Sequence, residues 1–100
     1  MIKGTVLYGH PKDADTFEKY YAEIHLPLVA KTNGVVKAEN TKFLPGPDGS
    51  ALAYYRMAKL YFTGPAEMQQ ALTSPEGQAM ASDLSNFATG GATIIFGIVE

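Results

Sequence analysis

Cysteine and tryptophan are both missing from this chain of 100 residues. Without cysteine the chain can form no disulfide and offers no thiolate to a metal ion, and we expect a cytoplasmic protein. The eight lysines and arginines are scattered singly and the formal net charge is −2, so we expect no nucleic-acid partner. No apolar run is long enough to cross a membrane, and we expect no membrane partner. A chain of this length predicts one domain, residues 1–100.

Patterns typical of metal and phosphate sites are missing as well. His10 and His25 are the only histidines, and they lie far apart in the chain. Glu23 and His25 would point to different sides of a helix, so they do not form a set of metal ligands. The glycine-rich turn at residues 46–49 lacks the following helix and lysine that a phosphate loop needs. We therefore expect no metal and no cofactor.

Alternating apolar residues and turn signals predict the order of the elements. Strands are expected at residues 2–8, 35–44, 52–63 and 92–99, with a turn at residues 45–50. Helices are expected over the central stretch that Asn33-Gly34 ends, from Pro65 to Leu72, and from Pro75 to about Ala88. This order predicts an α+β, ferredoxin-like βαββαβ fold with one four-stranded antiparallel sheet.

Both faces of this sheet are expected to be covered. In the last strand Ile94 and Phe96 lie on one side and Ile95 on the other, and the third strand also carries apolar side chains on both sides. The predicted helices cover only one face. We therefore expect the second face to pack on another copy of the chain, giving a sheet-to-sheet homodimer.

The strongest helical pattern runs from Phe17 to Val29, where apolar residues recur at helical spacing. Asp15 is expected to cap this helix, with Glu18 as the reciprocal partner of a capping box. Pro27 interrupts the pattern because a proline inside a helix removes one backbone hydrogen bond. The helix is therefore expected either to end near His25 or to bend there, and both alternatives place an imidazole beside irregular backbone.

His25 is the best candidate for a catalytic residue, because an imidazole can take up and return a proton near pH 7. Tyr21, one helical turn earlier, could orient His25 or donate a hydrogen bond to a substrate oxygen. The alternative is that His25 caps the backbone freed by Pro27 and is purely structural. A single histidine does not decide between these readings.

Five further residues are candidates for substrate binding. Tyr20, Tyr54 and Tyr55 would form an aromatic interior suited to a flat or apolar ligand, or equally a dimer interface. Glu39 and Arg56 each lie in the middle of a strand and are expected to be close across the hairpin. They could orient an imidazole or bind an anionic substrate, or form an ordinary ion pair between strands.

The chain resembles the EthD family of the dimeric α/β-barrel superfamily. The resemblance rests on four motifs: Phe17-x-x-Tyr20-Tyr21-x-x-x-His25-x-Pro27-Leu28-Val29, Ala58-x-Leu60-Tyr61-Phe62, Ala71-Leu72-x-Ser74-Pro75-Glu76-Gly77 and Asp83-x-x-x-Phe87. It implies a ferredoxin-like protomer whose sheet pairs with that of a partner to form a barrel. It also implies an association with bacterial degradation of ethyl tert-butyl ether, alongside a cytochrome P450 system. Relatives in the superfamily include isomerases, cyclases, cofactor-free monooxygenases and haem-degrading enzymes.

Three functions remain open from the sequence. The first is a cofactor-independent isomerase, cyclase or lyase that binds a small apolar or aromatic molecule and uses His25 as general acid and base, with Tyr21 assisting. The second is a non-catalytic binding or accessory protein of a catabolic pathway with the same pocket. The third is haem binding through His25, which the absence of tryptophan and of a second nearby histidine makes the weakest.

Overall fold

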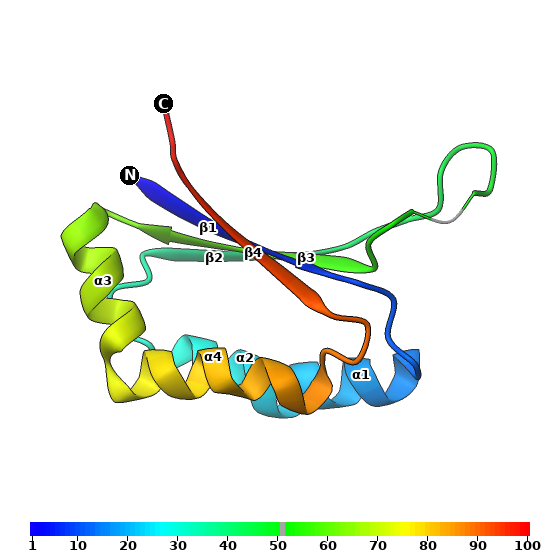
Figure 1. Cartoon of the computed structure of the whole chain (residues 1–100), viewed down its shortest axis with the longest axis horizontal. Helices are drawn as coiled ribbons and strands as arrows, with labels where there is room; N and C mark the ends of the chain where they lie inside the picture. The colour runs from blue at the N-terminus through cyan, green and yellow to red at the C-terminus, as the bar shows by residue number, and fades with distance from the viewer. Residues whose placement is uncertain (51) are drawn as a thin grey trace.

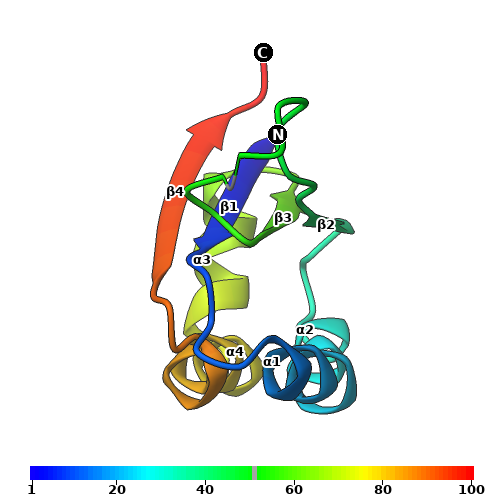
Figure 2. The ribbon, with the colours of Figure 1, turned by 90° about the vertical axis from the view of Figure 1, so that its right-hand side faces the viewer.

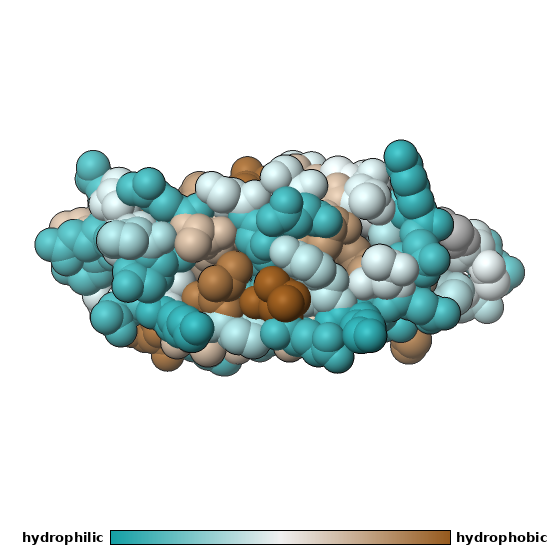
Figure 3. All heavy atoms as spheres, turned by 90° about the horizontal axis from the view of Figure 1, so that it is seen from below, coloured by the Kyte–Doolittle hydropathy of each residue, from teal (hydrophilic) through white to brown (hydrophobic). Residues whose placement is uncertain are grey.

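A computed structural model describes residues 1–50 and 52–100 as one antiparallel sheet with helices on one face. The sheet contains β1 (Ile2–Tyr8), β2 (Lys37–Lys42), β3 (Arg56–Phe62) and β4 (Ala92–Ile98), in the spatial order β2-β3-β1-β4. The order of the elements and the antiparallel pairing confirm the predicted ferredoxin-like α+β fold. Figure 1 shows the sheet above a layer of helices, and Figure 2 shows the same two layers from the end. Figure 3 shows the side of the helical layer that faces away from the sheet, which is mostly hydrophilic with a small apolar group near its centre.

The helices follow the local signals of the sequence. They are α1 (Ala14–Tyr20), η1 (Tyr21–His25), α2 (Leu26–Ala30), α3 (Pro65–Thr73) and α4 (Pro75–Phe87). Ser74 caps α4 by accepting a hydrogen bond from the Gly77 amide, with Pro75 at the first helical position. The cap of α1 is Asp13, which accepts a bond from the Thr16 amide. The predicted cap, Asp15, is instead an acidic residue of the first turn, where it favours the helix dipole.

The central helix neither ends at His25 nor needs a separate kink, because it widens into the π-helical turn η1. The Leu26 amide donates to the Tyr21 carbonyl, which is the i to i+5 bond of a π-helix. This widening occurs where Pro27 lacks an N–H and would otherwise press against the carbonyl of Glu23. The continuous helix keeps Tyr21 and His25 on one face, with their rings stacked at 5.6 Å between centroids.

The buried core consists of two separate clusters. The first cluster contains Tyr8, Phe17, Tyr21, Ala58 and Phe87, with further apolar side chains around it. The second cluster, at the α3 end of the sheet, contains Ile2, Phe62 and Ala71. Both clusters lie between the sheet and the helices, and the space between them is where a cavity opens.

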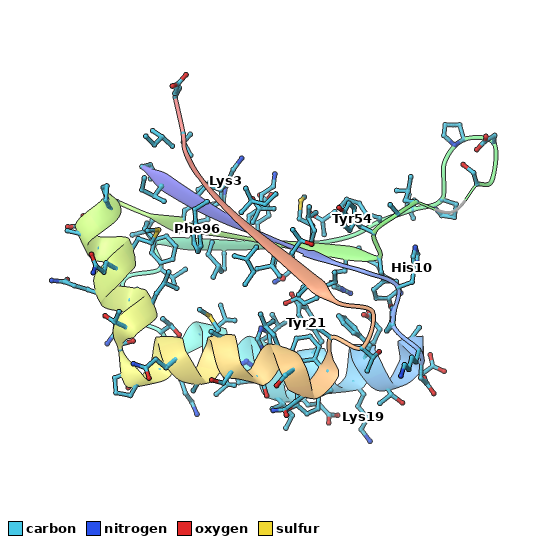
Figure 4. The ribbon with its side chains drawn as sticks, viewed as in Figure 1. Lys3, His10, Lys19, Tyr21, Tyr54 and Phe96 are labelled. Carbon is cyan, nitrogen blue, oxygen red and sulfur yellow. The ribbon has the colours of Figure 1, made fainter. Side chains whose placement is uncertain are left out.

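The outer face of the sheet is mixed rather than largely apolar. The central strands present Lys3, Thr5 and Lys59 there, alternating with Leu7 and Tyr61. Figure 4 shows Lys3 pointing away from the helices. The prediction of two apolar faces was based on the third and last strands alone. Strands β1 and β2 add polar side chains to the outer face, so that part of the prediction is wrong.

The hairpin register corrects the expected pairing of Glu39 with Arg56. In the β2–β3 ladder Glu39 lies opposite Lys59, and Arg56 lies opposite Lys42. The two residues are also on opposite faces of the sheet, because side chains alternate along a strand. Strands β2 and β3 are both shorter than predicted. Beyond the ends of β2, one backbone hydrogen bond joins Val36 to Tyr61 and another joins Phe43 to Tyr55.

Candidate functional site

A cavity of about 290 Å³ lies between the sheet and the helices. Strands β1 to β4 all contribute to its lining, as do η1, α2, α3 and α4. Most of the lining is aliphatic or aromatic. Hydrogen-bonding side chains enter it from Tyr8, Tyr21, His25 and Asn40. An apolar cavity with a few converging polar groups is the usual form of a small-molecule site.

His25 is buried at the cavity wall and is held by Asp83 of α4. Its Nδ1 lies 3.0 Å from Asp83 Oδ2, and both side chains are less than a tenth exposed. A carboxylate accepts hydrogen bonds only, so Nδ1 carries the hydrogen and Nε2 carries the lone pair. Among the described residues Nε2 has no hydrogen-bond partner, and His25 lines the cavity, so this nitrogen can act as a proton acceptor for a ligand.

Asp83 is fixed by donors on more than one side. Its Oδ1 accepts a hydrogen bond from the Tyr20 hydroxyl at 2.6 Å and from the Asn86 amide at 3.0 Å. Burial acts to raise the pKa of Asp83, but the bonds from Tyr20, Asn86 and His25 outweigh it and lower that pKa below its ordinary value. Asp83 therefore stays ionised and orients the imidazole.

Burial lowers the pKa of His25 below its ordinary value, while the hydrogen bond and charge of Asp83 oppose that shift. The imidazole is consequently neutral at pH 7. Two aromatic rings pack against the imidazole. The centroid of the Phe87 ring lies 4.6 Å from that of the imidazole, and the stacked Tyr21 ring lies 5.6 Å from it. A neutral imidazole with a fixed tautomer is prepared to accept a proton rather than to donate one.

Tyr21 connects His25 to two further polar groups. Its hydroxyl donates to Asn40 Oδ1 at 2.6 Å, and its ring packs edge-on against Tyr8 at 5.6 Å. Burial raises the pKa of Tyr21, partly opposed by the positive charge of Arg56, and burial also raises the pKa of Tyr8. Both phenols are therefore protonated near neutral pH and can serve as hydrogen-bond donors.

Arg56 packs against the ring of Tyr21. Its guanidinium makes two hydrogen bonds to the Glu18 carboxylate, at 2.6 and 3.2 Å, and lies 5.1 Å from the centre of the Tyr21 ring. This places a cation against an aromatic ring that faces the cavity. Arg56 itself does not line the cavity, and its carboxylate partner is Glu18.

The structure brings His25 and Tyr21 to the cavity but not the predicted substrate-binding residues. Tyr20 bonds to Asp83, and the Tyr55 ring packs against Phe17 at 5.3 Å. Tyr54 is 40% exposed, and Figure 4 shows it on the side of the sheet away from the helices. Glu39 lies on the outer face, 3.8 Å from the Lys37 ammonium.

Sequence reasoning missed three residues of this site: Tyr8, Asn40 and Asp83. A signal for Asp83 exists, since it interrupts an apolar stripe that continues through Met80, Leu84 and Phe87 at helical spacing. A carboxylate on the apolar face of a helix needs a buried partner. Tyr8 and Asn40 gave no such signal, because only the pairing of the strands places them beside Tyr21.

The described part of the chain has neither a cluster of metal ligands nor a helix that could span a membrane. In residues 1–50 and 52–100 no three or more histidine, aspartate or glutamate side chains are grouped to hold a metal ion. No helix in the same part of the chain has the length and apolar character needed to span a membrane.

The fold and its solved neighbours define a ferredoxin-like α+β protein. A dimeric ferredoxin-like protein from Thermobifida fusca aligns with a TM-score of 0.74 and 11% identity, over 98% of this chain and 90% of that one. SnoaB from Streptomyces nogalater, a cofactor-independent oxygenase, aligns with a TM-score of 0.66 and 15% identity, over 98% and 90%. At these identities the alignments show a shared fold.

The chain belongs to the EthD family, since the family model of the EthD domain matches residues 10–91. An uncharacterised 11.0 kDa protein of the thcB–thcC intergenic region of Rhodococcus erythropolis is 41% identical over 96 residues, which is 96% of this chain and 92% of that protein. A crystal structure of an EthD family protein from Bacillus halodurans has a TM-score of 0.92 and 30% identity, and the alignment covers 100% of this chain and 99% of that one.

Proposed function

We propose that the protein is a cofactor-independent enzyme that moves a proton on a small oxygenated, largely apolar compound. The observation that carries this proposal is the buried His25–Asp83 pair, whose Nδ1 to Oδ2 distance is 3.0 Å, at the wall of an apolar cavity. A general base needs a free lone pair, a fixed tautomer and a pKa not far from the working pH, and His25 has the first two by geometry.

In the proposed reaction His25 Nε2 removes a proton from a carbon next to a carbonyl group, or from a phenol. The electron pair left behind moves onto the carbonyl oxygen, and Asp83 stabilises the imidazolium that forms. The hydroxyl of Tyr8 or the amide of Asn40 would donate a hydrogen bond to the oxygen as its negative charge develops, while the hydroxyl hydrogen of Tyr21 stays on Asn40 Oδ1 and fixes that amide. Return of the proton to a different carbon completes an isomerisation, and cyclase and lyase steps begin in the same way.

The association of the family with ethyl tert-butyl ether does not by itself name the substrate. An ether oxygen can accept a hydrogen bond, but a simple ether offers no acidic proton to His25. A ketone, ester or phenol of similar apolar character suits the site better. That the shared fold houses a cofactor-independent oxygenase in SnoaB supports chemistry without a cofactor in this cavity.

The test is exchange of hydrogen for deuterium, because it detects proton removal whatever the complete reaction is. The protein is incubated in D₂O with 2-tetralone, a neutral bicyclic ketone, and the loss of the proton signals next to the carbonyl is followed by NMR. We expect the protein to accelerate exchange above the buffer rate, and His25→Gln to lose at least 100-fold of that acceleration, within the range typical of general-base catalysis.

The matched control is His10→Gln, which removes the other imidazole of the chain. His10 bonds to the Leu52 carbonyl outside the cavity, so this variant should exchange the ketone as fast as the unmodified protein. Equal rates for the His25 and His10 variants would refute the proposal. Binding of the ketone without any acceleration would favour the second candidate, a non-catalytic binding protein, which the apolar lining of the cavity also supports.

We also propose that the outer face of the sheet and β4 pack against a second copy of the chain. Every residue of β4 is exposed, and Ile95 and Ile98 are 53% and 74% exposed. An uncovered apolar edge strand favours association with another chain, and a twofold dimer is the commonest arrangement. Sedimentation equilibrium should give twice the mass of the chain, and a monomer at micromolar concentration would contradict the proposal.

A further inference from the structure

The cavity is polar at one end and apolar along the rest of its length. Tyr21 contacts Tyr8, His25 and Asn40, so the polar side chains of the lining form one cluster around it. Gly4 lies four residues before Tyr8 on β1, about 13 Å away at ~3.3 Å per residue. The other end of the cavity is therefore more than one ring system away from the polar cluster.

The far end is built from apolar side chains. In the register of the sheet, Gly4 lies opposite Leu60 on one side and Phe96 on the other, and both residues line the cavity. Phe62 and Leu72 continue the lining towards α3. Figure 4 shows Phe96 nearer to α3 than Tyr21 is. A ligand that fills the cavity must therefore place an apolar body against these residues.

No lysine, arginine, aspartate or glutamate is among the described residues that line the cavity. Asp83 lies behind His25, where it accepts three hydrogen bonds, and Arg56 is paired with Glu18. Tyr8, Tyr21 and His25 are buried, so a carboxylate or ammonium group of a ligand placed among them would lose its water without gaining an opposite charge. Such a transfer is strongly unfavourable.

We propose that this cavity selects uncharged molecules with a single oxygen-bearing head and a rigid apolar body, with the head at Asn40 and the body extending towards Phe96. This inference rests on the proposed function in that both place the ligand in the same cavity. The Oδ1 atom of Asn40 accepts the Tyr21 hydroxyl hydrogen, which leaves the amide Nδ2 as a donor for a carbonyl oxygen. His25 Nε2 then lies in the same cluster as the proton acceptor.

The volume limits the size of the ligand. A cavity of about 290 Å³ is roughly twenty to thirty times the space that a single water molecule requires, which is about 10–15 Å³. A compound with a bicyclic carbon skeleton and one oxygen is therefore of suitable size. Fatty acids and sugars are excluded on different grounds, since the former carry a charge and the latter carry many polar groups.

The experiment compares three probes with one body and different heads: tetralin, 2-tetralone and 1,2,3,4-tetrahydro-2-naphthoate. Their dissociation constants are measured by NMR titration at pH 7.5. We expect 2-tetralone to bind about fivefold more tightly than tetralin, which is the effect of one net hydrogen bond of about 1 kcal/mol. The naphthoate should bind at least tenfold more weakly than 2-tetralone. Equal affinity for the ketone and the carboxylate would overturn the inference.

Two variants locate the head and the body. Asn40→Leu should remove the difference between 2-tetralone and tetralin, whereas Thr41→Leu, on the same strand but facing the outer side, should preserve it. Ala38→Phe, which fills the lining opposite Leu60, should weaken all probes by at least tenfold. A ketone preference that survives in Asn40→Leu, or binding unaffected by Ala38→Phe, would also overturn the inference.

The two proposals can fail separately. If the probes bind in the expected order but the ketone does not exchange its protons faster, only the catalytic proposal is refuted. If exchange depends on His25 but the carboxylate binds as well as the ketone, only the proposed selection of uncharged ligands is refuted.

Discussion

Replacing Asp83 with asparagine should lower the pKa of His25 further. Burial already lowers that pKa, and the hydrogen bond and negative charge of Asp83 are what oppose it. Asparagine keeps the size of the side chain but removes the charge. A hydrogen bond to a charged group contributes ~1.5–3 kcal/mol and a neutral one ~1 kcal/mol, so the imidazolium loses about 0.5–2 kcal/mol of stabilisation. At 1.36 kcal/mol per unit, the pKa of His25 should fall by about one unit.

The assay is an NMR titration of the imidazole signals in the two proteins. The chain has two histidines, and His10 lies outside the cluster, so its signal should be the same in both and identifies the His25 signal. A variant in which the pKa of His25 is unchanged or raised would refute the assignment of Asp83 as the group that stabilises the charged imidazole.

The same shift predicts how stability depends on pH. The pKa of His25 in the folded protein lies below its ordinary value of 6.5, so the unfolded chain takes up this proton first as the pH falls. The contribution of His25 to the free energy of unfolding is complete above pH 6.5 and is lost as the pH falls towards the folded pKa. In Asp83→Asn that loss should continue to lower pH. Urea denaturation between pH 4.5 and 8 measures it.

Two further substitutions test the packing around the site. Arg56→Met should lower the free energy of unfolding by about 1–2 kcal/mol, because the partly buried Glu18 carboxylate loses two hydrogen bonds. The control is Lys42→Met. The Lys42 side chain is 55% exposed and lies 3.7 Å from Glu18, so its loss should change the free energy of unfolding by less than about 0.5 kcal/mol. Gly77→Ala should destabilise the protein even though alanine favours helices, because a Cβ atom there would collide with the Ala71 carbonyl, while Gly97→Ala on β4 has open space and should be tolerated. Thermal unfolding compares both pairs, and a Gly77 variant as stable as the Gly97 variant would contradict the second prediction.

Much of the fold could be predicted because its signals are local. Pro75 after Ser74 fixes the start of α4. The central helix ends earlier than predicted, at Ala30 with Lys31 as its C-cap, and Gly34, with a φ of 97°, lies in the turn that follows. The strand at residues 2–8 was predicted with the boundaries that the structure has. Such signals depend on backbone geometry within a few residues, so the sequence determines them without knowledge of the rest of the chain.

The π-helical turn shows the limit of local reasoning. Pro27 correctly predicts a disturbance near His25, but a helix can respond to a proline by ending, bending or widening. The central helix widens at Tyr21–His25 and then continues as α2, because α2 packs on α4. The choice depends on contacts with residues more than forty positions later in the chain.

The order of strands and helices, and the choice of His25 and Tyr21 as candidates, follow from periodicity and residue chemistry, which are properties of neighbouring residues. The bond between Asp83 and His25, the pairing of Arg56 with Glu18 rather than Glu39, and the cavity between the two core clusters arise only in the folded chain. These features depend on strand register and on the packing of helices against the sheet, which bring together residues far apart in the sequence. A shift of one residue in either would turn each of these side chains to another face.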